Sequence, residues 1–496
     1  MSTTRRQFTK NLLAGGAAVT LTNVASSRVL GANDEIRVGV VGTGGRGTHT
    51  HIPELEAVPG VSVVAVCDAD RSRMGKAAEM IDSKYGRKVD QYVDMRKMFE
   101  RQDIDVICNA TQVYWHALST VWACQAGKHV YVEKPLSHYI WEGRQVVAAA
   151  RKYDRMVQVG SQRRSQPCTR AAIEWTRQGH LGKIRYVTVF ISKPRRPCGQ
   201  RETPLPIPEA IDYDLWCGPA RKEPIYRDHL QYDCRYDLNT SAGEPVDQGT
   251  HDVDVARWWL GEAGLPHRVM SIGGRFLFND AGNVPNAQIV CFEYPTAPIV
   301  CEVHNLGNSK GSLEPSRFRG LRVGVCVHLE GGYVVNGLVG PPGCPWEAMA
   351  FDNDGQKIKD FPTGPNGSSE HDGTRDHFSN FFQAIRDGRR DDLHAEAEVG
   401  HISAATCLVG SLSHRVGRVA EETEQLAQVE EVPEFTETYE RFLEHLKANE
   451  IDPAAATLGP WLEIDHENEC VREHDQANEI VRGYYREPYV VPDLSV

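Results

Sequence analysis

The sequence contains little that would point to a membrane, a nucleic acid or a zinc ribbon. Beyond its N-terminal segment, no stretch approaches the roughly 18 apolar residues that a membrane-spanning helix needs. The formal net charge is −12 with no basic stripe, which makes nucleic acid a poor partner. The 13 cysteines include no C-x-x-C pair, which excludes the usual zinc-ribbon and thioredoxin spacings. We therefore expect no stable membrane span once the N-terminal segment, described next, is removed. We also expect the partner to be a small molecule.

The first 32 residues differ from the rest of the chain. Arg5 and Arg6 precede a short Gly/Ala-rich apolar stretch, residues 11–24, and this order resembles a twin-arginine export signal. A basic amphipathic start of the mitochondrial type is the alternative. We expect residues 1–32 to be the signal, and the remainder to be exported through the twin-arginine route to the periplasm or beyond.

A glycine-rich turn follows the first predicted strand, residues 36–41. Gly42 allows the tight turn, Gly44 lets the backbone approach a pyrophosphate, and Gly47 lets the next helix pack against the strand. The helix N-terminus then offers unpaired N–H groups to the phosphates. The residues between these glycines complete the predicted cofactor loop: Thr43, Gly45 and Arg46.

Asp68 closes the next apolar run, residues 61–67, and lies 21 residues after Gly47. A carboxylate at this spacing can accept hydrogen bonds from the ribose hydroxyls of the adenosine. It favours NAD(H), because it would repel a 2′-phosphate. Arg71 and Arg73 follow closely enough to keep NADP(H) open as an alternative.

The strand and helix patterns divide the chain. They alternate up to about residue 159, which predicts a doubly wound parallel sheet, an α/β Rossmann domain over residues 33–159. Short strands without intervening helices then indicate an α+β domain with a predominantly antiparallel open sheet over residues 160–430. Residues 431–496 form a C-terminal extension. We expect helices on one sheet face, an exposed second face, and therefore a homo-oligomer, a dimer or tetramer.

Lys134 stands in a Glu133-Lys134-Pro135 sequence after the predicted strand 129–132, at the carboxyl edge of the sheet. A lysine there can donate hydrogen bonds to a substrate hydroxyl or to the nicotinamide, and its charge favours a developing alkoxide. The alternative is a solvated loop lysine. Pro135 is a candidate for a cis peptide bond, which would fix the direction of the lysine.

Asp247 and His251 are four residues apart, so on one helical turn they would share a face. An acid beside an imidazole raises its basicity, as removal of a hydroxyl proton requires. The alternative is a packed histidine with Asp247 as N-cap. We predict no metal, because a second histidine at ligand spacing is missing and hydride transfer needs none.

Together these motifs resemble the glucose–fructose oxidoreductase / inositol dehydrogenase / MocA (Gfo/Idh/MocA) family, in particular its secreted bacterial branch. The resemblance runs over essentially the whole chain. Its pieces stand in order: VGTGGRG to Gly47, VCD to Asp68, NAT to Thr111 with His116, AGKHVYVEKP to Pro135, VGSQRR to Arg164, DYDLW to Trp216 with GPA, DQGTH to His251, and YYREPY to Tyr489.

The resemblance implies a catalytic trio in which His251 is the acid/base, Asp247 orients it and Lys134 polarises the reacting oxygen. It also places Thr111, His116 and Glu133 among the cofactor contacts, although this chain has Gln112 where the family commonly has proline. Arg163 and Arg164 are candidates to bind a substrate carboxylate or sulfate, with an interdomain salt bridge as the alternative.

The expected function is an exported NAD(H)-dependent oxidoreductase that moves a hydride between nicotinamide and a secondary alcohol of a polyol, sugar or sugar derivative. Because free NAD is scarce outside the cytoplasm, the cofactor is expected to stay tightly bound. A redox-neutral, NAD-dependent glycosidase or lyase is the alternative. A non-catalytic sugar-binding protein is a third, against which Lys134, Asp247 and His251 argue.

Overall fold

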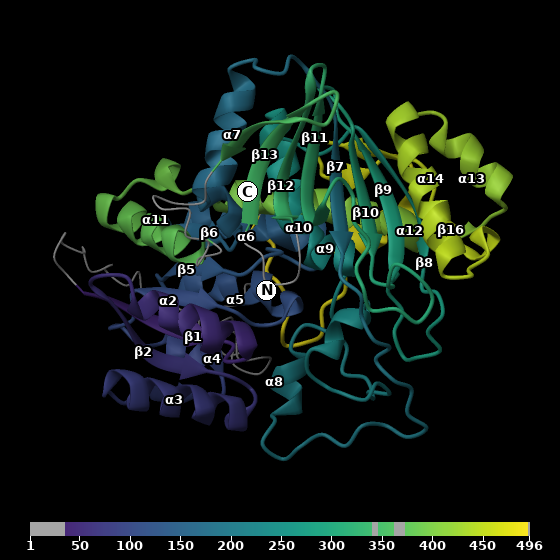
Figure 1. The fold of residues 1–496 in the computed structure, drawn as a ribbon. Helices are drawn as coiled ribbons and strands as arrows, with labels where there is room; N and C mark the ends of the chain where they lie inside the picture. The colour runs from purple at the N-terminus through teal and green to yellow at the C-terminus, as the bar shows by residue number, and fades with distance from the viewer. Residues whose placement is uncertain (1–34, 340–345, 362–372, 495–496) are drawn as a thin grey trace, which may run out of the picture.

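The computed structural model describes residues 35–339, 346–361 and 373–494 (Figure 1). The predicted signal, residues 1–32, lies outside these ranges. Within them, no helix is both long enough and apolar enough to cross a bilayer. The described chain forms two β-sheets. The first, from the purple and blue part of the chain, lies below and to the left of the second in Figure 1.

The first sheet has six parallel strands in the order β3-β2-β1-β4-β5-β6, which confirms the predicted doubly wound arrangement. One strand was not predicted, because β3 is short, polar and largely exposed and so lacks an apolar run. The strands are β1 (Ile36–Val41), β2 (Val61–Cys67), β3 (Asp90–Tyr92), β4 (Val106–Asn109), β5 (His129–Val132) and β6 (Val157–Val159).

Helices cover both faces of this sheet, which explains why its inner strands are almost wholly apolar. Helix α3 spans Arg71–Tyr85. The Asp70 carboxylate caps it by accepting from the Ser72 N–H at 3.0 Å, and it ends at Gly86, whose φ is 68°. Helix α5 spans Val113–Gln125 and follows β4.

A helix from much later in the chain completes this layer. Helix α11 (Thr374–Asp387) inserts Phe378, Phe381 and Phe382 into the core formed by β1 and β2. The first sheet is therefore covered in part by a helix that is far from it in sequence.

The second sheet is predominantly antiparallel, as predicted. Its order is β14-β13-β12-β11-β7-β10-β9-β8-β16-β15, and β7 and β10 form its parallel pair. The strands missed from sequence are β13, the polar β14 and the short strands near the C-terminus. The strands are β7 (Ile184–Ser192), β8 (Arg268–Gly274), β9 (Ala287–Glu293), β10 (Ile299–His304), β11 (Leu321–Leu329), β12 (Gly332–Val339), β13 (Trp346–Asp352), β14 (Lys357–Phe361), β15 (Arg418–Val419), β16 (Thr457–Leu458) and β17 (Leu462–Asp465), which pairs with β8.

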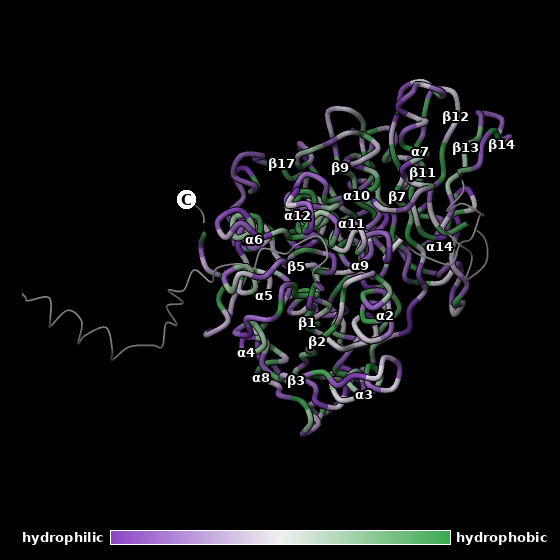
Figure 2. The backbone as a smooth tube through the Cα atoms, turned by 90° about the vertical axis from the view of Figure 1, so that its left-hand side faces the viewer, coloured by the Kyte–Doolittle hydropathy of each residue, from purple (hydrophilic) through white to green (hydrophobic). Residues whose placement is uncertain are grey.

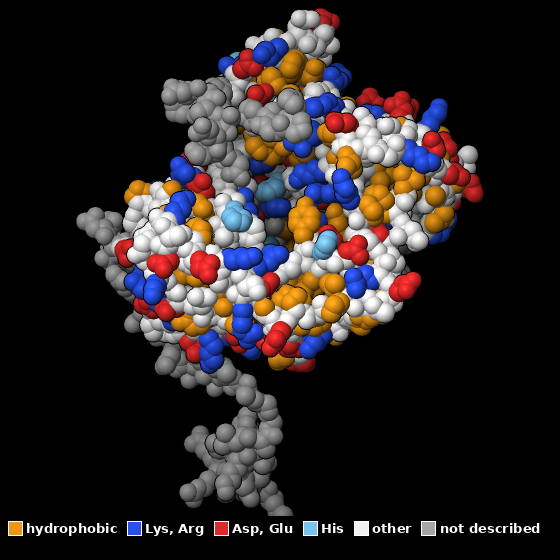
Figure 3. Space-filling view, turned by 60° about the horizontal axis from the view of Figure 1, so that its bottom comes forward, with side chains coloured by type: hydrophobic (Ala, Val, Ile, Leu, Met, Phe, Trp, Pro, Cys, Tyr) orange, Lys and Arg blue, Asp and Glu red, His pale blue; other side chains and the backbone are white. Residues whose placement is uncertain are grey.

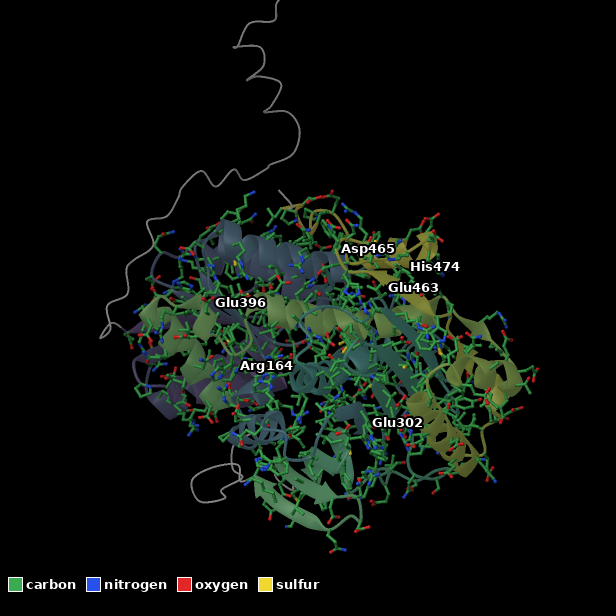
Figure 4. All side chains as sticks on the ribbon, turned by 90° about the horizontal axis from the view of Figure 1, so that it is seen from above. Arg164, Glu302, Glu396, Glu463, Asp465 and His474 are labelled. Carbon is green, nitrogen blue, oxygen red and sulfur yellow. The ribbon has the colours of Figure 1, made fainter. Side chains whose placement is uncertain are left out.

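One long helix joins the two sheets, and a second helix packs beside it against the second sheet. Helix α12 (Ala397–Arg415) contacts β8 of the second sheet and α6 (Ile140–Lys152) of the first domain, while α10 (Gly249–Leu260) lies against β7. Glu396, at the N-terminal end of α12 in Figure 4, accepts from Arg151 of α6. Figure 2 shows apolar backbone segments gathered in the interior and hydrophilic ones along the outer loops.

The outer face of the second sheet is not left bare. Helix α14 (Pro433–Ala448), from the C-terminal extension, packs Phe435, Tyr439, Phe442 and Leu446 against β8, β9 and β10. It lies with α13 (Glu422–Val429) at the right of Figure 1. The expectation of an exposed second face is therefore wrong over these strands, because the extension supplies the apolar cover. The homo-oligomer stays a prediction.

Candidate active site

A cavity of about 650 Å³ opens at the carboxyl edge of the first sheet, beside the start of α10. Figure 3 shows the molecular surface hollowed at a place where lysine, arginine and histidine side chains gather. Most of the predicted site residues line this cavity: Gly42, Gly44, Gly45, Arg46, Asp68, Thr111, His116, Glu133, Lys134, Asp247 and His251.

The glycine loop at one end of the cavity is sterically closed to side chains. Gly42 has a φ of 86°, and a Cβ there would lie 2.6 Å from the carbonyl carbon of Ala110. A Cβ on Gly47 would lie 1.9 Å from the Gly42 carbonyl oxygen. A Cβ on Gly45 would meet nothing within 4 Å. The loop thus presents bare backbone to the cavity, as a pyrophosphate requires.

Asp68 is held at the end of β2 by the glycine loop itself. Its Oδ2 accepts from the Thr43 backbone N–H at 2.7 Å and from the Thr43 hydroxyl at 3.1 Å, and its Oδ1 accepts from the Asp70 N–H at 2.9 Å. Burial raises the pKa of this carboxyl. Thr43 therefore supports Asp68 and does not itself line the cavity.

A smaller cavity adjoins Asp68 and is closed on one side by α8 (Tyr213–Cys217). Two aromatic side chains of α5 hold α8 in place: the Tyr114 hydroxyl donates to the Trp216 carbonyl at 2.7 Å, and the Trp115 indole N–H donates to the Leu215 carbonyl at 3.0 Å. The second domain thus covers the adenosine end of the nucleotide cleft.

The C-terminal tail fastens this cover. Arg486 donates through Nη1 to the Asp214 carboxylate at 2.8 Å and through Nε to the Gly218 carbonyl at 3.1 Å. The Tyr489 hydroxyl donates to the same carboxylate at 3.0 Å. These are residues of the DYDLW and YYREPY sequences, which the resemblance flagged without a role.

The Glu133-Lys134-Pro135 sequence brings two charged groups to the cavity, and the Lys134–Pro135 peptide bond is cis, as the sequence suggested. The Lys134 ammonium donates to the Asp247 backbone carbonyl, and burial lowers the pKa of this lysine. Glu133 accepts from Arg46 Nε at 2.9 Å and contacts His51 Nε2 at 2.7 Å. Although burial opposes ionisation, these two partners hold the pKa of Glu133 below its usual range.

Asp247 and His251 do not share one helical turn. Asp247 ends the short helix α9 (Glu244–Asp247), whereas His251 belongs to α10, which begins at Gly249. The Asp247 Oδ2 accepts from the Ser241 hydroxyl at 3.0 Å. Among the described residues, His251 Nδ1 is buried with no hydrogen-bond partner. The expected orientation of His251 by Asp247 is therefore not seen.

His251 is a neutral base in this setting. Burial, and after it the charge of Lys134, hold the pKa of His251 well below its ordinary value. An uncharged imidazole beside an ammonium group can accept a hydroxyl proton while the cation stabilises the negative charge left on the oxygen.

His116 bridges two loops at the cavity wall. Its Nδ1 lies 2.6 Å from the Pro135 carbonyl oxygen and its Nε2 lies 3.1 Å from that of Thr111. The Thr111 hydroxyl donates to the Asn109 side chain at 2.7 Å. His116 thus ties the loop after β4 to the cis peptide after β5.

The two arginines of the VGSQRR sequence are already neutralised. Arg163 is buried and pairs with Asp252, and Arg164 makes two hydrogen bonds to Asp254, at 2.7 and 2.8 Å. Neither lines the cavity, and Figure 4 shows Arg164 beside α10 and α7 (Pro167–Arg177). The candidate role in substrate binding therefore fails on geometry, and the salt-bridge alternative describes them.

Several lining residues were missed because they lie in loops without periodicity. Gln162 follows β6, whereas Arg73, in the first turn of α3, was already named for its bearing on NADP(H). The rest come from the segment that runs over the cleft after α8, where composition alone indicates no site: Gln231, Tyr232, Cys234, Arg235, Thr240 and Ser241.

Comparison with known proteins shows what the chain is similar to. Residues 36–161 match the model of the Gfo/Idh/MocA family, described as an oxidoreductase family with an NAD-binding Rossmann fold. Glycosyl hydrolase family 109 protein 2 of Shewanella sp. (strain ANA-3) is 31% identical over 160 residues, which cover 28% of this chain and 35% of that protein. The uncharacterized oxidoreductase YrbE of Bacillus subtilis (strain 168) is 26% identical over 229 residues, covering 46% and 54%. The chain thus spans between a third and about half of the length of these relatives.

Solved structures share the fold over more of the chain. Aldose-aldose oxidoreductase from Caulobacter crescentus, complexed with glycerol, is 16% identical with a TM-score of 0.55, covering 76% of this chain and 97% of that one. The WlbA dehydrogenase from Bordetella pertussis, in complex with NADH and UDP-GlcNAcA, is 18% identical with a TM-score of 0.53, covering 76% and 95%. Residues 36–161 thus match the NAD-binding Rossmann domain described for this family, and the two-sheet fold is shared with solved structures of oxidoreductases.

Proposed function

We propose that this protein is an NAD(H)-dependent oxidoreductase that acts on a secondary alcohol of a polyol, sugar or sugar derivative. One observation carries the proposal. A neutral imidazole and a half-buried ammonium group, those of His251 and Lys134, share one cavity with a glycine loop that fits a dinucleotide.

The residues present fit the cofactor. The open backbone at Gly44 and Gly45 suits the pyrophosphate, and the Asp68 carboxylate suits the ribose hydroxyls. When bound, NAD supplies a hydride acceptor or donor at its nicotinamide ring. NADP(H) is less favoured, although Arg73 lines the cavity and would be the residue to meet a 2′-phosphate.

Residues of the chain itself then transfer the proton of the substrate hydroxyl. His251 takes it from the substrate hydroxyl through an imidazole nitrogen, and Lys134 stabilises the oxygen that is left negative. In the opposite direction His251 returns the proton. Asp247 acts indirectly: its backbone carbonyl oxygen accepts a hydrogen bond from the Lys134 ammonium and so holds that group in place.

A second candidate function is a redox-neutral glycosidase that uses NAD transiently. It is favoured by the relatives of the chain, among them glycosyl hydrolase family 109 proteins of Shewanella, each matched over about a third of its length or less. It is also favoured by the cover that α8 and the tail place over the adenosine end, because an enclosed cofactor suits a reaction that regenerates it in place.

The same enclosure supports a tightly bound cofactor. Together with the paired arginines near the N-terminus, it supports an exported enzyme that leaves the cytoplasm folded and loaded. Assembly as a homo-oligomer remains part of this proposal.

The test is His251→Ala against the exposed control His49→Ala. Nucleotide released on denaturation is identified by mass spectrometry, and turnover is measured with polyols, sugars and aryl glycosides. We expect His251→Ala to keep its nucleotide and lose about 10²–10⁴-fold in kcat, while His49→Ala matches the wild type. Equal turnover of the two variants would refute the role of His251, and a wild type without affinity for either nucleotide would refute the function.

A further inference from the structure

Arg235 enters the substrate end of the cavity from a loop that the function proposed above does not use. It belongs to the short 3₁₀ turn Asp233–Tyr236 and lines the cavity together with Lys134, Asp247 and His251. Its position places a guanidinium group beside the proposed catalytic groups, at the end of the cavity away from the glycine loop.

This arginine differs from the other two arginines among the described residues that line the cavity. Arg46 pairs with Glu133 at 2.9 Å, and Arg73 lies 3.5 Å from the Asp70 carboxylate. Arg235 makes no ion pair with any described carboxylate. It contacts the Tyr232 hydroxyl, 3.5 Å from Nη1, and the Tyr232 ring, whose centre lies 4.4 Å from the guanidinium carbon.

The hydrogen-bonding capacity of Arg235 is therefore largely unused. Its Nε is buried and has no partner among the described residues. Burial disfavours its charge, but Asp247 and Glu244 attract the guanidinium without direct contact and raise its pKa, so the group stays charged with donors free. Its planar fork of donors matches the two oxygens of a carboxylate or sulfate group.

The neighbouring charges leave a positive excess at this end of the cavity. Glu244 is engaged by Arg195 at 3.2 Å, which leaves Asp247 as the nearby carboxylate without an ion pair among the described residues. Against it stand Lys134 and Arg235, while the half-buried Lys193, whose ammonium donates to the Gln248 side chain, lies near Glu244. An anionic group entering here would be attracted and would complete the pairing.

We propose that Arg235 binds a carboxylate or sulfate group of the substrate, so that the site takes an acidic sugar in preference to a neutral polyol. This proposal rests on the function proposed above. It moves the anion-binding role suggested by the sequence from Arg163 and Arg164, which are neutralised by aspartates, to a residue with free donors in the cavity.

The test is a binding comparison on the nucleotide-loaded protein by titration calorimetry at low salt. The probes are D-glucuronate, D-gluconate and glucose 6-sulfate, set against D-glucose and D-sorbitol, so that carboxylate and sulfate are separate arms. We expect at least one acidic probe to bind at least tenfold more tightly than its neutral counterpart. The preference should fall as salt is raised, because added ions screen the attraction.

Arg235→Gln should reduce this preference to threefold or less while nucleotide content and thermal unfolding stay as in the wild type. Arg235→Lys should restore only part of it, since a lysine keeps the charge but lacks the fork. Arg73→Gln is the matched control, because it removes another cavity arginine at the adenosine end, and it should keep the full preference.

Equal or undetectable binding of acidic and neutral probes by the wild type would overturn the proposal, as would an Arg235→Gln variant that keeps the preference. A failure of the proposed function is distinguishable from either result, because it would appear as a protein without affinity for NAD or as a His251→Ala variant with unchanged turnover.

Discussion

The two ends of the cleft are built in different ways. The nucleotide end comes from one short stretch, in which the loop after β1 and the end of β2 hold each other through Thr43 and Asp68. The substrate end is assembled from groups that are far apart in the chain, Lys134, Arg235 and His251. The first end is constrained mainly by backbone sterics, whereas the second depends on charges that face each other only after both domains are folded.

The largest effect should come from closing the nucleotide end. Gly47→Ala places a methyl group against the Gly42 carbonyl oxygen, and the backbone has no flexible group to move aside. We expect bound nucleotide to fall below about a tenth of the wild-type amount, with roughly 1–3 kcal/mol lost from the free energy of unfolding. Gly45→Ala is the control, since its Cβ would meet nothing within 4 Å. Nucleotide retained equally by both variants would contradict the steric account.

The next effect concerns Lys134 and has two readouts. In Lys134→Met, kcat for alcohol oxidation should fall about 10²-fold, because the developing alkoxide loses its cation. Lys134 also lowers the pKa of His251, so its removal should raise that pKa towards the ordinary 6.5. Oxidation needs the unprotonated imidazole, and its loss at falling pH should therefore begin at a higher pH in the variant.

The measurement for Lys134→Met is a pair of pH–rate profiles, with the exposed Lys152→Met as control. If the rate falls in Lys134→Met but the pH at which activity is lost on the acid side does not shift, Lys134 and His251 are not electrostatically coupled. The comparison of the two cleft ends would then lose its main support, because the substrate end would no longer behave as one charged unit.

A smaller effect is expected from Asp68→Asn. The amide keeps the size of the side chain but weakens acceptance from Thr43 and from the ribose hydroxyls, so the affinity for NAD should fall about tenfold. The preference for NAD over NADP should narrow at the same time, because the repelling charge is removed. Unchanged affinities for both nucleotides, measured by calorimetry on stripped protein, would show that Asp68 only shapes the loop.

The smallest effect should come from the tail. Arg486→Ala removes the contacts to Asp214 and Gly218 that fasten α8 over the adenosine end. We expect bound nucleotide to dissociate several-fold faster with kcat little changed, because the cover holds the cofactor and does not touch the reacting groups. Arg482→Ala is the control, since Arg482 packs on Trp141 and does not contact α8. Dissociation rates measured by dilution into excess labelled NAD decide between them.

Much of the first domain could be predicted because its signals are local. Its inner strands are continuous apolar runs, and helix α3 has a capping aspartate at one end and a glycine at the other. The polar strand β3 was not predicted, because it pairs at the edge of the sheet with little side-chain burial. Helix α14 was located approximately, but its role in covering the second sheet was not visible, because amphipathicity shows that a face is buried without showing against what.

For the catalytic candidates, too, the sequence predicted what depends on local features and not what depends on tertiary contacts. Lys134 and His251 were identified by sequence and do meet in one cavity. The assumed helical pairing of Asp247 with His251 failed, because the chain divides into two helices at Gln248. Arg163 and Arg164 were candidates for substrate binding with a salt bridge as the alternative, and the structure decides for the salt bridge. A motif shows that a charge is present but not whether another charge has already neutralised it.

By itself, the sequence determined the nucleotide-binding turn, its acidic partner and the identities of the proposed catalytic lysine and histidine. Each of these depends on backbone conformation or on the end of a strand, which neighbouring residues dictate. Tertiary structure alone decided that Arg235 faces the cavity while Arg163 does not, and that α8 and the tail enclose the adenosine end. Burial and ion pairing depend on which distant segments meet, and that information exists only once the two sheets are packed together.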